Sequence, residues 1–139
     1  MSFSADDRAL LAALADILIP AAGGMPSASQ AGVAGTGLDH VLAARPDLVA
    51  VLADVLGKAR GSEPGDVITA IRASDPAAFG VLAEIVPAAY FMNPDVRETI
   101  GYAGQIPRSI DPHPDYLDDG LLQSVISRGP IFRPTPKSN

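Results

Sequence analysis

Apolar residues recur along the N-terminal two-thirds of the chain with the spacing of α-helices, and the two-residue alternation of half-buried β-strands is absent. The first such segment spans residues 4–20. Ser4 and Asp7 have the spacing of a capping box, in which each side chain binds the backbone N–H of the other residue. Pro20 predicts the end of the helix, because proline cannot continue the hydrogen-bond ladder. The apolar stripe consists of Leu10, Leu11, Leu14, Ile17 and Leu18.

Two later helices carry clear start signals. In Ser74-Asp75-Pro76 the aspartate is suited to cap a helix and the proline to occupy its first position. Asn93-Pro94 repeats this arrangement, and Gly101 predicts the end of that shorter helix. Pro87, inside the longer helix, predicts a kink near Ala83. These two helices are predicted over 76–91 and 94–100. Further helices are predicted over 37–45, 46–60, 66–73 and 117–126, and residues 21–35 are predicted to form a loop.

The residues after Gly101 are rich in glycine and proline, yet they still carry large apolar side chains. Such a segment needs a surface to lie on, either its own bundle or another protein, and its prolines lower the entropy lost on docking. We therefore predict an all-α single domain. It consists of a small helical bundle over 1–100 and an extended irregular arm over 101–139 that contains one short helix.

Composition narrows the possible functions. Sixteen acidic against ten basic side chains give a net charge of −6, which argues against nucleic-acid binding. The absence of cysteine excludes disulfides, thiolate metal sites and cysteine nucleophiles.

The apolar stretch 10–22 superficially resembles the core of a signal peptide. Its flank is acidic, however, and Asp16 interrupts it, whereas a signal peptide has a basic start and an unbroken apolar run. No run approaches the length of about 18 residues that a transmembrane helix needs. We expect a cytoplasmic protein that does not bind membranes.

The residues with catalytic potential are few. His113 lies between Asp111 and Asp115, which could supply metal ligands or an acid–base pair, but a solvated turn is the favoured interpretation. His40 is expected on the solvent side of its helix. The glycines of 32–37 follow no predicted strand, so a dinucleotide site is not expected. We therefore predict no catalytic, cofactor-binding or metal-binding residue in this chain.

Three segments carry a family resemblance, and they lie at residues 11–20, 26–33 and 91–105. The most specific part is Asn93-Pro94, followed by Ile100-Gly-Tyr102 and Gly104-Gln105. In these segments the chain resembles the gluconate 2-dehydrogenase subunit 3 family. These proteins are the small (gamma) subunits of bacterial flavin-dependent sugar and alcohol dehydrogenases, whose large subunit belongs to the glucose–methanol–choline oxidoreductase superfamily.

The resemblance implies a helical, non-catalytic accessory subunit that stabilises a large dehydrogenase subunit, with FAD and the catalytic histidine in that partner. Many family members carry a twin-arginine export signal, which residues 1–8 lack, so the cytoplasmic two-subunit members acting on sugars or glycosides are the closer comparison. Two alternatives remain open: a free-standing helical ligand-binding protein, and a small lyase or isomerase that uses His113 with a carboxylate.

The aromatic pair Tyr90-Phe91 is expected to contribute to the core rather than to a ligand pocket, since aromatics at helical spacing are more often core. The region from Tyr90 to Phe132 is also expected to form much of the contact with the partner. The candidate contact residues are Tyr90, Phe91, Tyr102, Gln105, Ile106, Tyr116, Ile131, Phe132 and Arg133.

Overall fold

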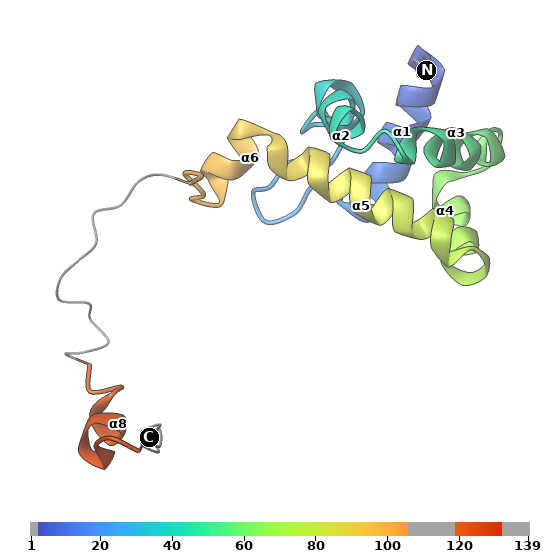
Figure 1. Ribbon diagram of the computed structural model, residues 1–139. Helices are drawn as coiled ribbons and strands as arrows, with labels where there is room; N and C mark the ends of the chain where they lie inside the picture. Colours follow the sequence, from blue (N-terminus) through green and yellow to red (C-terminus); the bar gives the residue numbers. More distant parts are fainter. Residues whose placement is uncertain (1–2, 106–118, 132–139) are drawn as a thin grey trace. The chain divides into compact units, whose positions relative to one another are not determined.

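The computed structural model describes residues 3–105 and 119–131, and within them it contains seven α-helices and no β-strand. The predicted all-α fold is confirmed (Figure 1). The chain divides into two compact units, Met1–Gly104 and Gln105–Asn139. The first unit contains α1 (Ala5–Leu18), a π-helical turn η1 (Val33–Gly37), α2 (Leu38–Ala44), α3 (Leu48–Ala59), α4 (Pro64–Ser74), α5 (Pro76–Met92) and α6 (Pro94–Thr99), and the second contains α8 (Gln123–Arg128).

The helix starts predicted at Ser4, Asp75 and Asn93 are confirmed, and each of these side chains caps its helix. Both hydrogen bonds of the Ser4–Asp7 capping box are present at the start of α1. The Asp75 carboxylate accepts a hydrogen bond from the backbone N–H of Ala78 at 3.0 Å. The Asn93 side-chain oxygen accepts two backbone N–H groups in the first turn of α6. Each cap satisfies N–H groups that have no partner inside their own helix.

Most helix boundaries lie within two residues of the prediction, but those of η1 and α8 differ more. The loop predicted to reach residue 35 ends earlier, because η1 begins directly after Gly32. α5 continues through Pro87 and ends at Met92, one residue later than predicted, and the kink near Ala83 stays a prediction. α8 begins only at Gln123, since Gly120 has a φ of +72°, which a right-handed helix cannot contain. The first residues of the predicted helix 117–126 lie outside the described residues.

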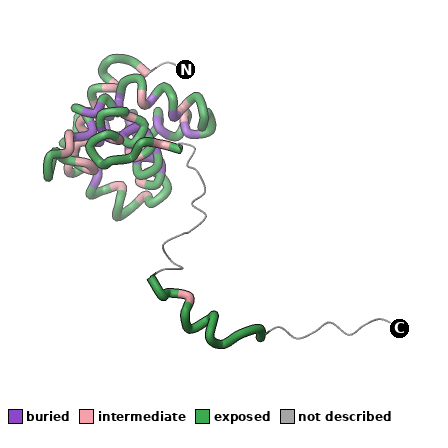
Figure 2. The backbone as a smooth tube through the Cα atoms, turned by 90° about the vertical axis from the view of Figure 1, so that its left-hand side faces the viewer, coloured by how far each residue is buried: buried purple, intermediate pink, exposed green. Residues whose placement is uncertain are grey.

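α5 organises the bundle, because it packs against α1, η1, α2, α3, α4 and α6. Figure 1 shows it crossing the bundle from α4 to α6. The buried side chains are mainly leucine, isoleucine, valine and alanine, and they come from η1 and from every helix of this unit; Figure 2 shows this core in purple. The largest fully buried ones are Leu11, Leu14, Leu38, Leu52, Leu56, Leu82, Ile85, Val33, Val86 and Val96.

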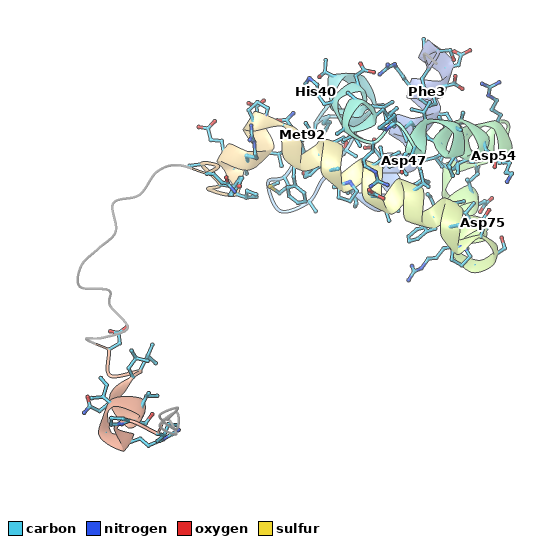
Figure 3. The ribbon with its side chains drawn as sticks, viewed as in Figure 1. Phe3, His40, Asp47, Asp54, Asp75 and Met92 are labelled. Atoms are coloured by element: carbon cyan, nitrogen blue, oxygen red, sulfur yellow. The ribbon has the colours of Figure 1, made fainter. Side chains whose placement is uncertain are left out.

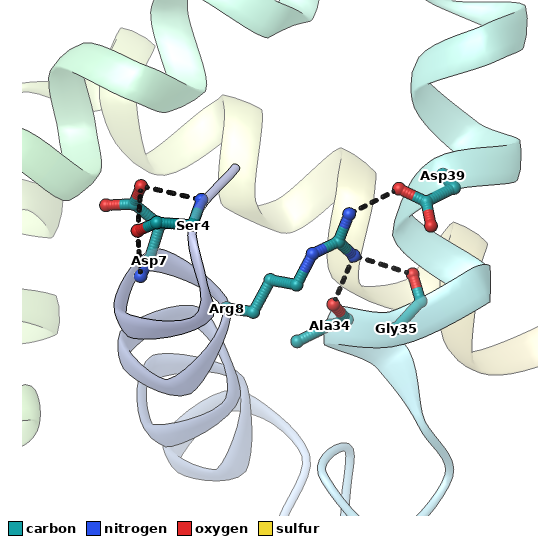
Figure 4. A network of polar contacts seen from close by, with 6 residues as sticks. All are labelled: Ser4, Asp7, Arg8, Ala34, Gly35 and Asp39. Carbon is teal, nitrogen blue, oxygen red and sulfur yellow. Dashed lines mark hydrogen bonds and ion pairs between the residues drawn. The ribbon is translucent and has the colours of Figure 1, made fainter. Parts of the chain in front are cut away.

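Arg8 links α1 to the irregular entry of α2 (Figure 4). Its guanidinium donates to the carbonyl oxygens of Ala34 at 2.8 Å and Gly35 at 3.1 Å, and to a carboxylate oxygen of Asp39 at 2.6 Å. The backbone of Gly35 is not helical, so its turn does not follow the regular bonding of a helix. The arginine supplies donors to two carbonyls of this turn.

Asp7 links the start of α1 to the end of α3. Its carboxylate accepts a hydrogen bond from Arg60 at 2.6 Å and also binds the side chain and backbone of Ser4. The hydrogen bond from Arg60, followed by those from Ser4, lowers the pKa of Asp7 from 3.8 to about 2. A carboxylate whose pKa is lower in the folded than in the unfolded chain stabilises the fold above its unfolded pKa.

We predict that Asp7→Asn is less stable than the wild type at neutral pH and that this difference shrinks as the pH falls from about 4 to about 2. Over this range the wild-type carboxylate takes up a proton and loses its advantage. Urea unfolding midpoints measured at a series of pH values test this. Asp6→Asn removes the neighbouring charge but none of these contacts, and is the control. If the unfolding midpoints of wild type and Asp7→Asn differed by the same amount at every pH, the ionised Asp7 carboxylate would not be the source of the stability difference.

Gly37 marks a close approach between the start of α2 and α5. A Cβ atom at this position would lie 3.1 Å from the Cβ and 3.3 Å from the backbone oxygen of Ala89. Since Ala89 lies within α5, its backbone cannot easily move away. Gly57, within α3, has open space where its Cβ would be.

We predict opposite effects for two identical substitutions. Gly37→Ala should lower the free energy of unfolding by about 1–3 kcal/mol, because the added methyl overpacks the contact. Gly57→Ala should raise it by about 0.5–1 kcal/mol, because alanine loses less backbone entropy in a helix. Urea denaturation of both variants checks the pair, and a stabilised Gly37→Ala would show that α2 and α5 are free to separate.

Candidate partner-binding face

Tyr90 belongs to the core, as expected, but the same expectation for Phe91 is wrong, because its side chain is 50% exposed at the end of α5. Its side chain is 3% exposed, and its hydroxyl donates a hydrogen bond to the carbonyl oxygen of Pro26 at 2.7 Å. Asn93 donates to the carbonyl of Ala31 at 2.9 Å from the same end of α5. Both side chains therefore hold the 21–32 loop in place through hydrogen bonds to its backbone. Tyr90 was also a candidate contact residue, but its burial leaves it no direct contact with a partner in this conformation.

Asp16 fastens the same loop from α1. Its carboxylate accepts hydrogen bonds from the backbone and the hydroxyl of Ser29, at 2.7 and 2.6 Å. Burial raises the pKa of Asp16, but the hydrogen bonds from Ser29 and Ser27 outweigh it, so the pKa lies below 3.8. This carboxylate has a structural role and its hydrogen bonds keep it ionised.

The outer side of α5 is an exposed stripe with almost no charge. Ala77, Gly80, Glu84, Ala88 and Phe91 follow the 3–4 residue spacing of one helix face, and all five are exposed. Glu84 is the single charged residue among the 17 of this helix, and it forms an ion pair with Arg45. Surface helices normally place charged and polar groups on this side.

Large exposed apolar side chains follow at the C-terminal end of α5 and directly after α6. Phe91 is 50% exposed, Met92 45%, Ile100 50% and Tyr102 52%. The ring of Phe91 meets the buried ring of Tyr90 edge-on, with centroids 5.3 Å apart. This arrangement is a favourable one for aromatic pairs, so one side of Phe91 is supported by the core while the other faces solvent.

Backbone hydrogen bonds fix Tyr102 at the end of α6. The N–H of Gly101 donates to the carbonyl of Glu98 at 2.9 Å, and that of Tyr102 donates to the carbonyl of Arg97 at 2.8 Å. With Gly101 at a φ of +70°, these bonds form a Schellman motif. Tyr102 thereby borders a hollow of about 370 Å³ whose lining includes Pro94, Arg97 and Glu98.

We call the exposed residues Ala77, Gly80, Glu84, Ala88, Phe91, Met92, Ile100 and Tyr102 the α5–α6 face. Figure 3 labels Met92, which lies where α5 meets α6. Of the sequence-predicted contact residues, Phe91 and Tyr102 belong to this face, and Gln105, the first residue of the second unit, is exposed.

The second unit presents apolar groups of its own. Ile131 is 75% exposed, and in and before α8 Leu121, Val125 and Ile126 are 56–70% exposed. No residue of α8 is buried. A helix of six residues is too short to be stable alone in water, so these groups favour contact with another surface. The remaining candidates, Ile106, Tyr116, Phe132 and Arg133, lie outside the described residues.

The described residues bring no reactive cluster together. His40 is exposed on α2, as predicted, and borders a hollow of about 150 Å³ with Thr36, Met92 and Asn93. Among the described residues, the lining of that hollow contains no carboxylate. Over 3–105 and 119–131, no three histidine, aspartate or glutamate side chains are grouped so as to hold a metal ion. His113 lies outside these residues.

The outer stripe of α5 escaped the sequence analysis, which identified only Tyr90 and Phe91 as notable side chains on this helix. The signal was nevertheless present, because a helix of this length with one charged residue has no polar side to offer to water. The fixed position of Tyr102 could also have been inferred, since a glycine directly after the last helical turn is typical of a Schellman motif.

Comparison with known protein families, with curated proteins and with solved structures gives no match. None of the described helices has the length and apolar character required to cross a membrane.

Proposed function

We propose that this chain is a non-catalytic small accessory subunit that binds and stabilises a large FAD-dependent sugar or alcohol dehydrogenase of the glucose–methanol–choline type. In this proposal the partner holds FAD and performs the chemistry. The observation that carries it is the α5–α6 face, a set of apolar residues on α5 and after α6 that the bundle leaves exposed.

The face has the properties of an interface core. Protein interfaces are enriched in aromatic residues and methionine and depleted of charge at their centre. The face has two aromatic side chains, a methionine and one charged residue, which is paired. Because Phe91 is supported by Tyr90 and Tyr102 is held by its backbone, little conformational entropy would be lost when they bind.

The family resemblance supports the same surface. Its third segment, 91–105, contains the large exposed side chains Phe91, Met92, Ile100 and Tyr102, and the last two belong to its most specific part. Within that segment, Asn93 caps α6 and Val96 is fully buried, so these two serve the fold. A segment that holds its own backbone firmly while exposing several large apolar groups is suited to contact a partner.

We predict that Phe91→Glu prevents co-purification of the flavoprotein while the chain remains folded. A charge at the centre of an interface typically costs 2 kcal/mol or more, which corresponds to at least about a 30-fold rise in Kd. The experiment isolates the tagged chain from its native cells and records the flavin absorbance of the material that comes with it.

Ile17→Glu is the matched control, because Ile17 is 49% exposed, on α1, outside the α5–α6 face. It should retain the flavoprotein. If the wild-type chain comes without a flavoprotein, the proposal fails and a free-standing ligand-binding protein takes its place. If both variants retain the partner equally, the α5–α6 face is not the interface.

A truncation after Gly129 tests the contribution of the arm. The truncated chain lacks the exposed Ile131 together with Phe132 and Arg133. We predict that it stays helical and unfolds at the same temperature as the full chain but recovers less flavoprotein, since aromatic and arginine residues are common interface anchors. Far-ultraviolet circular dichroism during heating is the measurement. A clearly lower melting temperature for the truncated chain alone would assign these residues to its own core.

A further inference from the structure

A third hollow lies between α3 and α4, on the side of the bundle where α5 begins. α4 packs on α1 and α5, and the hollow of about 250 Å³ remains between α4 and the C-terminal half of α3. Its floor is apolar, and α3, α4 and α5 all contribute residues to it. The floor residues are Val55, Ala59, Val67, Ala70, Ile71 and Ala78.

α3 extends this floor beyond the hollow. Val51 precedes Val55 by four residues, so the two lie one turn apart on the same side of the helix. Val51 is 42% exposed, so covering its side chain with another apolar surface would be favourable. From Val51 to Ala59 α3 rises about 12 Å, which is slightly more than two helical turns. We call this surface the α3–α4 groove.

The rim of the groove is acidic. Asp66 and Asp75 border it, and Lys58 is the one cation among the described residues of its lining. Asp54 binds the Lys58 ammonium at 2.7 Å. Figure 3 shows Asp54 on α3 and Asp75 at the α4–α5 corner, at the same end of the bundle.

The negative field of this rim acts on Lys58 itself. The hydrogen bond and the charge of Asp54 raise the pKa of Lys58, and the charge of Asp75 adds to this effect. Since these groups are exposed, each pair contributes little to stability. Their combined field is still available to attract a cation that comes to the groove.

We infer that the α3–α4 groove binds a basic amphipathic helix of a partner protein. An apolar trough between two helices receives the apolar side of such a helix through residues spaced at i, i+4 and i+7. The excess of carboxylates at the rim selects lysine or arginine beside these anchors. The groove uses Ala78, whose side chain faces the core, whereas the α5–α6 face uses the opposite side of α5. It is therefore a separate site and does not depend on the function proposed above.

A displayed library of helical peptides tests this inference. The library fixes leucine at i, i+4 and i+7, randomises the flanking positions, and is selected on the full chain. We expect the selected peptides to be enriched in lysine and arginine. Fluorescence anisotropy of a selected peptide should then show binding that weakens as salt is added, because exposed charges are screened.

Two substitutions locate the binding site. Ala70→Glu fills the exposed part of the floor and should weaken peptide binding at least about tenfold, a loss of 1.4 kcal/mol. Ala53→Glu introduces the same group on the opposite side of α3 and should leave binding unchanged. Asp66→Lys should weaken basic peptides and reduce the salt dependence. Melting temperatures of the three variants establish that each is folded.

Three results would overturn the inference. Enrichment of acidic or neutral flanks would show that the rim does not select a cation. Equal binding by Ala70→Glu and Ala53→Glu would place the peptide elsewhere. A wild-type dimer in analytical ultracentrifugation that Ala70→Glu dissociates would show that the groove is covered by a second copy of the chain.

Discussion

The fold depends on the burial of one helix that is apolar nearly all round. α5 has a single charged residue, and every other element of the bundle packs on it. Its inner side contributes more buried side chains to the core than any other element does, and the hydrophobic effect stabilises this arrangement in proportion to the apolar area covered. A domain of this size has too few elements to enclose such a helix completely. The same apolar composition therefore has two results: the inner side of α5 forms the centre of the core, and its outer side is left exposed.

Polar contacts then position the irregular segments around this helix. Arg8 binds the carbonyls of η1, and Tyr90 and Asn93 bind carbonyls of the preceding loop. Each contact satisfies a backbone oxygen in a stretch that lacks regular helical bonding. These contacts join residues far apart in sequence, so the loop takes a defined shape although it contains no long regular helix.

Local signals in the sequence were sufficient to predict the helices. The caps at Ser4, Asp75 and Asn93 involve residues two or three positions apart, and all three were predicted. The contacts that define the loop could not be predicted, because Tyr90 meets Pro26 and Arg8 meets Ala34 only after the helices have packed. For the same reason Tyr90 was assigned two roles from the sequence, one in the core and one at an interface.

The candidate face was predicted in part. Phe91 and Tyr102 were identified by their size and their place near glycine and proline, and both are half-exposed. The stripe along α5 was missed, since a count of apolar residues does not tell which of them the neighbours will cover. The α3–α4 groove was missed too, because its depth depends on α4 packing on α1 and α5 instead of on the preceding helix.

The contact between Gly37 and Ala89 has a geometric consequence for the exposed end of α5. Two small residues let the backbones of α2 and α5 approach closely, so neither helix can roll or slide there without a collision. Ala89 lies only two residues before Phe91, and the contact therefore sets the direction in which that ring projects. A glycine and a buried alanine in this way determine the direction of one of the largest exposed side chains.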